Sequence, residues 1–178
     1  MEFFAHWDQA VFYSINHLQN PFLDALSLWV VETRQLTWLV LMILFTFLSK
    51  RKDRWRIAIV GILLLVSVDF LTHLFLKPFF HRLRPCHVLQ NVILRVPCPA
   101  SASFPSGHVF DIFTLAVFFG FYYPKWIGTL SLVTILVSLS RIYIGVHYPL
   151  DVLGSAALGT LAAFLGRMIE KKLKRKQS

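Results

Sequence analysis

Long runs of apolar residues, separated by short polar segments, dominate the chain from residue 36 onward. A membrane-spanning helix needs about 20 mainly apolar residues, so each run is a candidate span. Two runs are shorter than this, and the earlier one can recruit polar neighbours or let its flanking cations reach the membrane surface. The pattern predicts five spans, at Leu36–Ser49, Ile57–Leu76, Val109–Tyr123, Trp126–Ile144 and Leu150–Ile169.

The first 31 residues follow a different pattern, in which apolar side chains recur at helical spacing opposite Glu2, Asp8 and Gln9. A helix with one apolar face of this kind suits the membrane interface. Asn20-Pro21 ends this helix, and a second apolar helix follows, which either lies flat or enters the bilayer as a sixth crossing. The predicted fold class is therefore all-α: an integral membrane bundle of about five transmembrane helices, or six, preceded by interfacial amphipathic helices.

The composition supports a membrane protein. Hydrophobic residues make up 56% and charged residues 15% of the 178 residues, whereas soluble domains carry about 25% charged residues. A mean hydropathy of +0.61 argues against a disordered chain and against a nucleic-acid-binding globule. Polar stretches are too short for a separate soluble domain. We expect one domain, with interfacial helices at 1–31, a transmembrane bundle at 32–169 and a basic tail at 170–178.

The net charge of +9 is unevenly distributed, and this predicts the sidedness. With five spans, the loop at 50–56 and the basic tail share the side that holds most of the cations. The positive-inside rule places that side in the cytoplasm of a bacterial inner membrane. The amino terminus and the segments Lys77–Gly107 and Arg141–Pro149 then face outward. The remaining cations are concentrated in these two outward segments, which calls for a separate explanation.

Three polar segments at the outward ends of the predicted spans supply that explanation. Lysine and arginine side chains occur in these segments, and the first segment contains no acidic residue that could pair with its cations. Arginine matches phosphate oxygens in a bidentate manner. A serine and a glycine precede a predicted helix start, where backbone N–H groups can approach an anion closely. The sequence thus predicts a phosphate site built from Lys77, Arg84, Ser106, Gly107 and Arg141.

Two histidines and an aspartate add chemistry to this site. His147 and Asp151 are four residues apart at a helix start favoured by Pro149. An aspartate bonded to one imidazole nitrogen leaves the other nitrogen available as a nucleophile. His108, from another span, can protonate the leaving oxygen and then activate water. The arrangement predicts phosphoryl transfer through a phosphohistidine, with side-chain cations in place of a metal and with no cofactor.

The pattern K-x6-R-P, P-S-G-H and S-R-x5-H-x3-D resembles that of the type 2 phosphatidic acid phosphatase (PAP2) superfamily of integral membrane lipid phosphatases. All three segments match at every defining position and in the same order, from Lys77 to Asp151. The resemblance implies a metal-independent phosphatase with the roles argued above. The amino-terminal part is short, whereas larger relatives have six spans, so the number of crossings stays open.

The resemblance implies removal of the terminal phosphate from a membrane lipid phosphate or diphosphate at the outer face of the membrane. Undecaprenyl diphosphate and lipid A 1-phosphate are the favoured substrates. Phosphatidylglycerophosphate and phosphatidic acid are alternatives, because the motifs contact a phosphate group that all four lipids share. A non-catalytic lipid-phosphate binder or transporter is the alternative of another class. The presence of His108, His147 and Asp151 favours the enzyme.

Further polar residues lie near these motifs. Asp69, His73 and Lys77 are spaced i, i+4 and i+8, which predicts one helical stripe leading to the site, either as a proton path or as a structural hydrogen-bonding set. Arg82, at a variable position of the first motif, can contact a second phosphate or a headgroup. Small residues in the last span, including Gly154 and Gly159, favour close helix packing.

Both cysteines, Cys86 and Cys98, lie in the longest polar loop. Two alternatives remain open from the sequence. In an oxidising compartment the two thiols can form a disulfide that closes the loop, and otherwise they are free thiols at the surface.

Overall fold

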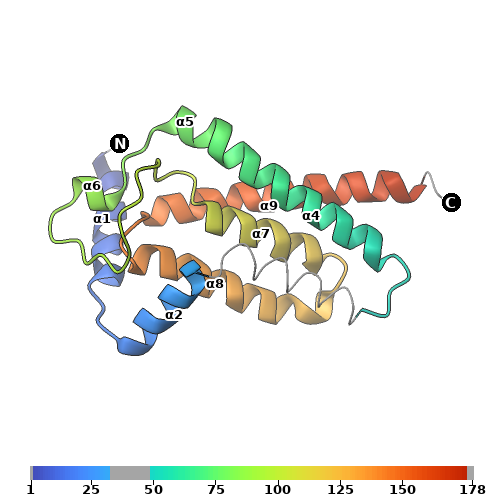
Figure 1. Cartoon of the computed structure of the whole chain (residues 1–178), viewed down its shortest axis with the longest axis horizontal. Helices are drawn as coiled ribbons and strands as arrows, with labels where there is room; N and C mark the ends of the chain where they lie inside the picture. The colour runs from blue at the N-terminus through green and yellow to red at the C-terminus, as the bar shows by residue number, and fades with distance from the viewer. Residues whose placement is uncertain (1, 33–48, 176–178) are drawn as a thin grey trace.

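The structure is a computed structural model that describes residues 2–32 and 49–175. Every regular element in these two ranges is a helix. Four long helices follow the long axis of the molecule side by side (Figure 1). They are α4 (Arg54–Leu71), α7 (Gly107–Gly120), α8 (Ile127–Tyr143) and α9 (Pro149–Arg175). The predicted all-α bundle is confirmed.

Four of the five predicted spans coincide with these helices. Three segments, Arg54–Val88, Pro124–Tyr143 and Pro149–Arg175, are long and apolar enough to cross a membrane. The shorter helix α7 is buried along most of its length, as expected for a helix at the centre of the bundle. The remaining predicted span, Leu36–Ser49, lies outside the described residues except for Ser49, so the total number of crossings stays a prediction.

The core lies where the four long helices meet. Each contributes buried apolar side chains, among them Ile57, Phe118, Val137 and Ala163. Helices α7 and α9 pack most closely. A Cβ atom added at Gly159 would lie 2.8 Å from the backbone oxygen of Phe110 and 2.8 Å from the Cβ of Phe113. The close packing predicted for the last span is confirmed at this position.

Two amino-terminal helices cover one end of the bundle (Figure 1). Helix α1 (Glu2–Asn16) lies across that end and contacts α8 and α9, whereas α2 (Pro21–Glu32) packs against α8. The Asn20 side chain accepts hydrogen bonds from the N–H groups of Phe22 and Leu23, at 2.9 and 3.2 Å. Asparagine is a preferred cap of this kind, which explains why the chain breaks there and restarts as α2.

The faces of α1 differ from those expected. The sequence pattern grouped Phe12 with Phe3 and placed Asp8 on the opposite, polar face, and this is wrong. Asp8, Phe12 and Asn16 form the buried face at i, i+4 and i+8, with at most 1% of each side chain exposed. Phe3 and Phe4 point outward and are 76% and 63% exposed. This outward apolar surface is the one available to the membrane interface.

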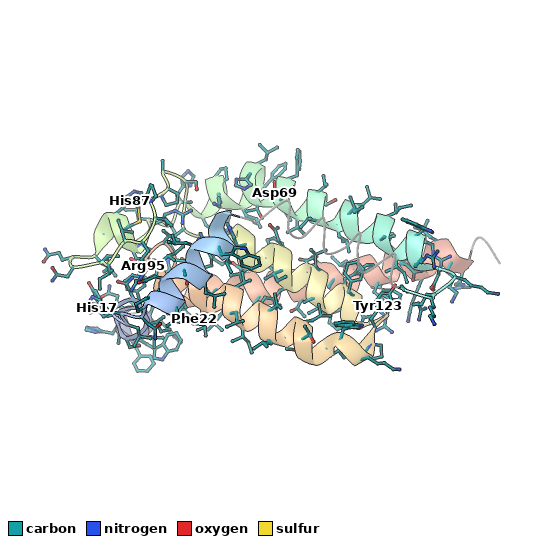
Figure 2. All side chains as sticks on the ribbon, turned by 60° about the horizontal axis from the view of Figure 1, so that its bottom comes forward. His17, Phe22, Asp69, His87, Arg95 and Tyr123 are labelled. Atoms are coloured by element: carbon teal, nitrogen blue, oxygen red, sulfur yellow. A yellow bond between two sulfur atoms is a disulfide. The ribbon has the colours of Figure 1, made fainter. Side chains whose placement is uncertain are left out.

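Short helices and loops gather at the same end as α1. The last turn of α4 continues into a π-helix (η1, Thr72–Leu76), then α5 (Lys77–Phe80) and α6 (Pro85–Val88). A disulfide joins Cys86 to Cys98, with the Cα atoms 6.2 Å apart. Figure 2 shows His87 and Arg95 at this end and Tyr123 at the opposite end.

The opposite end carries the loop before α4, the 3-10 turn η2 (Pro124–Trp126) and the end of α9 (Figure 1). The buried carboxylate of Glu170 holds these parts together. It accepts a hydrogen bond from Arg56 Nε at 2.8 Å and one from the Tyr122 hydroxyl at 2.9 Å. The two basic segments of the sequence therefore lie at one end and the three motifs at the other, as the predicted alternation of spans requires.

Candidate active site

His147 lies in the loop between α8 and α9, and only 3% of it is exposed. Arg84 Nη1 is 3.2 Å from His147 Nε2. A guanidinium has no acceptor, so this contact requires Nε2 to carry a lone pair and places the imidazole proton on Nδ1. Arg84 is itself held by the backbone oxygens of Val146, Ser101 and Ala102. The loop geometry thus selects one tautomer of His147.

Asp151 stands in the first turn of α9, fully buried, with its Oδ2 3.7 Å from His147 Nδ1. The same Oδ2 accepts hydrogen bonds from the Ser103 hydroxyl and from the Tyr148 N–H, the latter at 2.9 Å. Oδ1 accepts a hydrogen bond from Arg82 at 2.6 Å. The carboxylate is therefore held on both sides while it faces the protonated nitrogen of the imidazole.

Burial lowers the pKa of the His147 imidazole to about 3, and the neighbouring Arg141 and Arg84 guanidinium groups act in the same direction, whereas Asp151 opposes them. Loss of hydration disfavours the charged form of a buried histidine. His147 is consequently neutral near pH 7, with an unprotonated Nε2. A neutral imidazole is the form that can act as a nucleophile.

The cations predicted to bind phosphate surround this imidazole. Lys77 is buried at the start of α5, and its ammonium donates to Ser101 Oγ at 3.2 Å. The same hydroxyl accepts a hydrogen bond from Arg84 Nη2 at 3.1 Å, so Ser101 links the two cations of the first motif. Arg141, in the last turn of α8, is buried on another side of His147.

The second motif forms the start of α7. Ser106 is buried in extended backbone before the helix, and its N–H donates to Ser155 Oγ at 2.8 Å. Ser155 in turn donates to the Asp151 backbone oxygen at 2.6 Å, which attaches the start of α7 to the start of α9. Within the described residues, the buried Ser106 hydroxyl has no hydrogen-bond partner. Gly107 and His108 occupy the first turn of α7, at the same place.

The helix that carries Asp69, His73 and Lys77 contains a π-helical turn before Lys77. The N–H of Lys77 bonds to the carbonyl of Thr72, five residues earlier, so the π-helix adds one residue to the turn. Buried positions consequently step by four from Val68 to Thr72 and then by five to Lys77. Asp69 and His73, 3.6 Å apart, remain on the partly exposed outer side of the helix, and Figure 2 shows Asp69 away from the end that carries the motifs.

Arg82, predicted from the sequence as a contact to a second phosphate or a headgroup, forms ion pairs with two carboxylates in the structure. Its guanidinium binds Asp151 through Nη1 and Asp8 through Nη2, and it lies 4.4 Å from the centre of the Tyr148 ring. Two carboxylates therefore meet its charge. Sequence reasoning missed Asp8 altogether, together with three buried or bridging serines that belong to no motif: Ser101, Ser103 and Ser155.

Among the described residues, the side chains with metal-ligand types and spacing are Cys86, His87 and Cys98. Their ligand atoms lie within 4.8 Å of one another, but the disulfide uses both sulfur atoms. The site around His147 instead gathers cations, which suit an anionic ligand. In chemical terms it combines a neutral imidazole, a buried carboxylate and a set of phosphate-matching donors.

Known proteins share this architecture. The model of the PAP2 superfamily matches residues 54–175. An undecaprenyl-diphosphatase from Sulfolobus acidocaldarius is 34% identical over 90% of this chain and 77% of its own length. A lipid A 4'-phosphatase from Porphyromonas gingivalis is 32% identical over 90% of this chain and 72% of its own.

A crystal structure supports the same relationship. LpxE of Aquifex aeolicus superposes with a TM-score of 0.75 at 28% identity, covering 91% of this chain and 95% of its own. The fold of that protein, the family match and the curated relatives therefore agree with a multi-pass helical membrane bundle. The chain belongs to the PAP2 superfamily and is a membrane phosphatase of that type.

Proposed function

We propose that this protein is a metal-independent lipid phosphatase that removes the terminal phosphate of a membrane lipid phosphate or diphosphate through a phosphohistidine at residue 147. The observation that carries the proposal is the orientation of His147. Its lone pair on Nε2 faces Arg84, whereas Nδ1 faces the buried carboxylate of Asp151. A phosphate bound by the cations would thus meet an unprotonated nitrogen.

In the first step, Nε2 of His147 attacks phosphorus, and the bond to the lipid oxygen breaks. His108, at the start of α7, donates the proton that this oxygen takes up on leaving. The imidazole becomes cationic as the phosphohistidine forms, and Asp151 stabilises this charge from the Nδ1 side. In the second step His108 accepts a proton from water, the water oxygen attacks phosphorus, and inorganic phosphate and neutral His147 are released.

The phosphoryl oxygens are bound by groups from three parts of the chain. Lys77 and Arg84 supply charge from the first motif, and Arg141 supplies it from α8. The unpartnered hydroxyl of Ser106 and the first N–H groups of α7, at Gly107, complete the set. Such preorganised donors stabilise the charge that spreads over the equatorial oxygens, which is the task a metal performs in other phosphatases.

The substrate proposed is undecaprenyl diphosphate or a lipid A phosphate. The support is the names of the relatives, which act on those two lipids. Large apolar side chains within the first motif, Phe79, Phe80 and Leu83, are exposed and can contact the lipid chains of a substrate held in the bilayer. Phosphatidylglycerophosphate and phosphatidic acid are the alternatives, since the phosphate-binding groups do not distinguish among lipid tails.

We further propose that the site faces the outer side of the inner membrane and the basic tail faces the cytoplasm. Two observations support this orientation. The end with the basic loop and tail is opposite the end with the motifs, as the positive-inside rule would require. The disulfide between Cys86 and Cys98 lies at the motif end and suits an oxidising compartment.

The proposal is tested by phosphate release from four purified lipids in detergent, with EDTA present throughout. The lipids are undecaprenyl diphosphate, lipid A, phosphatidylglycerophosphate and phosphatidic acid. We expect release from one of the first two at the highest kcat/KM, and we expect no release by a His147→Gln variant. Activity that disappears in EDTA and returns with a divalent ion would contradict the metal-independent mechanism. Lipid binding with no release by the unmodified protein would favour a binder or transporter.

A further inference from the structure

Asp8 is a buried carboxylate in α1, a helix that none of the three motifs includes. It is 1% exposed, although its neighbours Trp7 and Gln9 are not buried. Its Oδ2 binds Nη2 of Arg82, and its Oδ1 accepts a hydrogen bond from the N–H of Leu150 at 2.8 Å. A buried carboxylate is costly unless it is paired in this way. Both of its partners lead to the candidate active site.

The first connection runs through a shared guanidinium. Arg82 uses its two terminal nitrogens for two different carboxylates, Asp8 in α1 and Asp151 in α9. The planar fork fixes the directions of both bonds, which a lysine could not do. The position of Asp8 therefore sets the position from which Arg82 contacts Asp151.

The second connection runs through the start of α9. The N–H of Leu150 is one of the donors left unpaired at a helix amino terminus, and Asp8 accepts from it, one residue before Asp151. The packing reinforces this contact, because the fully buried Phe12, one turn after Asp8, lies against the Tyr148 ring with the ring centres 5.9 Å apart. Helix α1 thus positions the backbone next to Asp151 directly, and it positions one carboxylate oxygen of Asp151 through Arg82.

The charges of Asp8, Arg82 and Asp151 determine how strongly Asp151 can stabilise a cationic His147 in the proposed mechanism. Asp8 neutralises Arg82, so the negative charge of Asp151 remains available to the Nδ1 side of His147. Asp151 is also contacted by the Ser103 hydroxyl and the Tyr148 N–H, and His147 is also faced by Arg84 and Arg141. Without Asp8, the full charge of Arg82 would act on Asp151 and weaken its support of the imidazolium.

We propose that Asp8 is a positioning residue for the Asp151–His147 pair and acts through Arg82 and the start of α9. This inference rests on the proposed function, because it assumes that His147 is the nucleophile. It assigns a role in the chemistry to an interfacial helix outside the motifs. Asp8 does not touch the phosphate site, so its effect falls on the rate of phosphoryl transfer rather than on the binding of lipid.

The test compares Asp8→Asn with Asp24→Asn. The control is matched because Asp24 also joins the amino-terminal helices to the motif end through an arginine, Arg95, at 2.6 Å, but it has no contact with Asp151. For both variants the measurements are the melting temperature, KM, kcat and the rate of phosphoenzyme formation in a single turnover with radiolabelled lipid. Asp8→Glu, which retains the charge, tests rescue.

We expect Asp8→Asn to lower kcat by about 10- to 100-fold, the range typical of residues that orient a functional side chain, with KM changed by less than about twofold. Phosphoenzyme formation should slow by the same factor, and Asp8→Glu should recover most of it. Asp24→Asn should leave kcat within about twofold of the unmodified protein. The inference is overturned if Asp8→Asn matches Asp24→Asn in kcat, or if it alters only KM.

Two further variants keep the outcome interpretable. If Asp8→Asn does not fold, Arg82→Lys replaces it, because an ammonium lacks the planar fork that fixes the directions of the two bonds. An unchanged kcat in that variant overturns the inference. His147→Gln separates the two proposals. If the unmodified protein releases no phosphate, or if His147→Gln is fully active, the proposed function fails and the inference fails with it. If His147→Gln is inactive but Asp8→Asn is fully active, only the inference fails.

Discussion

Arg84 and His147 are 63 residues apart in the chain, yet Nη1 of the one lies 3.2 Å from Nε2 of the other. The cation therefore faces the lone pair of the imidazole rather than its proton. A phosphate attracted to Arg84 would come to lie in front of the nitrogen that can attack it. This contact joins the first motif to the third. In the proposed mechanism it places a phosphate-binding cation beside the nucleophilic nitrogen.

Replacing His147 by glutamine should abolish turnover without unfolding the protein. No other described side chain combines an unprotonated nitrogen with a contact to Arg84. We expect phosphate release to fall by at least about 10⁴-fold, as for the loss of a key group in a covalent mechanism. Release is measured by phosphate assay, and folding by the melting temperature. A substitution of the exposed His87 is the control, and substantial turnover by the His147 variant would refute the covalent mechanism.

Replacing His108 by alanine should separate the two halves of the reaction. A leaving group that needs no proton, such as a nitrophenolate, can depart without His108, whereas the attack of water still requires a base. We therefore expect slow formation and pronounced accumulation of phosphoenzyme with an activated aryl phosphate. Acid-labile, base-stable radiolabel on the quenched protein measures it. Rapid steady turnover of this substrate by the variant would exclude His108 as the base.

The free protein should lose stability as the pH falls below 6.5. In this range the unfolded chain takes up a proton at His147, while burial keeps the folded imidazole neutral because its pKa is lowered to about 3. The free energy of unfolding should fall by about 1 kcal/mol per pH unit from this group. Melting temperatures at pH 7 and pH 5.5 measure the effect. The melting temperature should fall less between pH 7 and pH 5.5 in His147→Gln than in His87→Gln. Equal falls in the two variants would contradict the assignment of this pH dependence to His147.

A methyl group at Gly159 should destabilise the contact between α7 and α9. Its Cβ would lie 2.8 Å from a backbone oxygen of α7 and 3.0 Å from the Thr114 nitrogen, and backbone cannot move aside as a flexible side chain can. We expect Gly159→Ala to cost about 1–3 kcal/mol, the usual cost of overpacking. Thermal unfolding in detergent measures it. Gly128→Ala in α8 is the control, because within the described part of the chain no atom outside the adjacent turns of its own helix lies within 4 Å of the added Cβ.

Reducing the disulfide should lower thermal stability but leave the chemistry intact, since no proposed step uses sulfur. The bond between Cys86 and Cys98 closes a loop over a sequence separation of 12. In the chain-entropy model, closure of a loop of this size contributes about 3 kcal/mol. Unfolding with and without reductant measures the loss. Equal melting temperatures for the parent and a double Cys→Ser variant would disprove the stabilising role.

Local sequence predicted the helices well, because a helix depends on residues close together in the chain. The apolar run of Ile57–Leu76 became a helix, and Pro149 preceded the turn that carries Asp151, as expected. Asp8 could not be found in this way. Its burial depends on Arg82, which is 74 residues away, and a polar residue beside Trp7 looks like part of a solvated face.

The π-helix before Lys77 could not be predicted from the sequence for a different reason. Regular spacing from Asp69 assumes 3.6 residues per turn, but the chain forms a π-helix at Thr72–Leu76. No glycine or proline lies within that segment to mark the change. The spacing of these residues therefore could not show that Asp69 and His73 are partly exposed whereas Lys77 is buried.

The π-helix makes the direction of Lys77 depend on both the length and the hydrogen bonding of this turn. A lysine four residues after Thr72 on an α-helix and a lysine five residues after it on a π-helix point in nearly the same direction. Deleting one residue between Thr72 and Leu76 would therefore give a regular α-helix with the lysine still on the side of the cation cluster. If the turn instead kept its length and adopted α-helical hydrogen bonds, Lys77 would rotate by about 100° relative to Thr72 and leave that side. The length and the hydrogen-bonding pattern of this turn can thus change together, but not one without the other, if the ammonium is to stay beside Ser101.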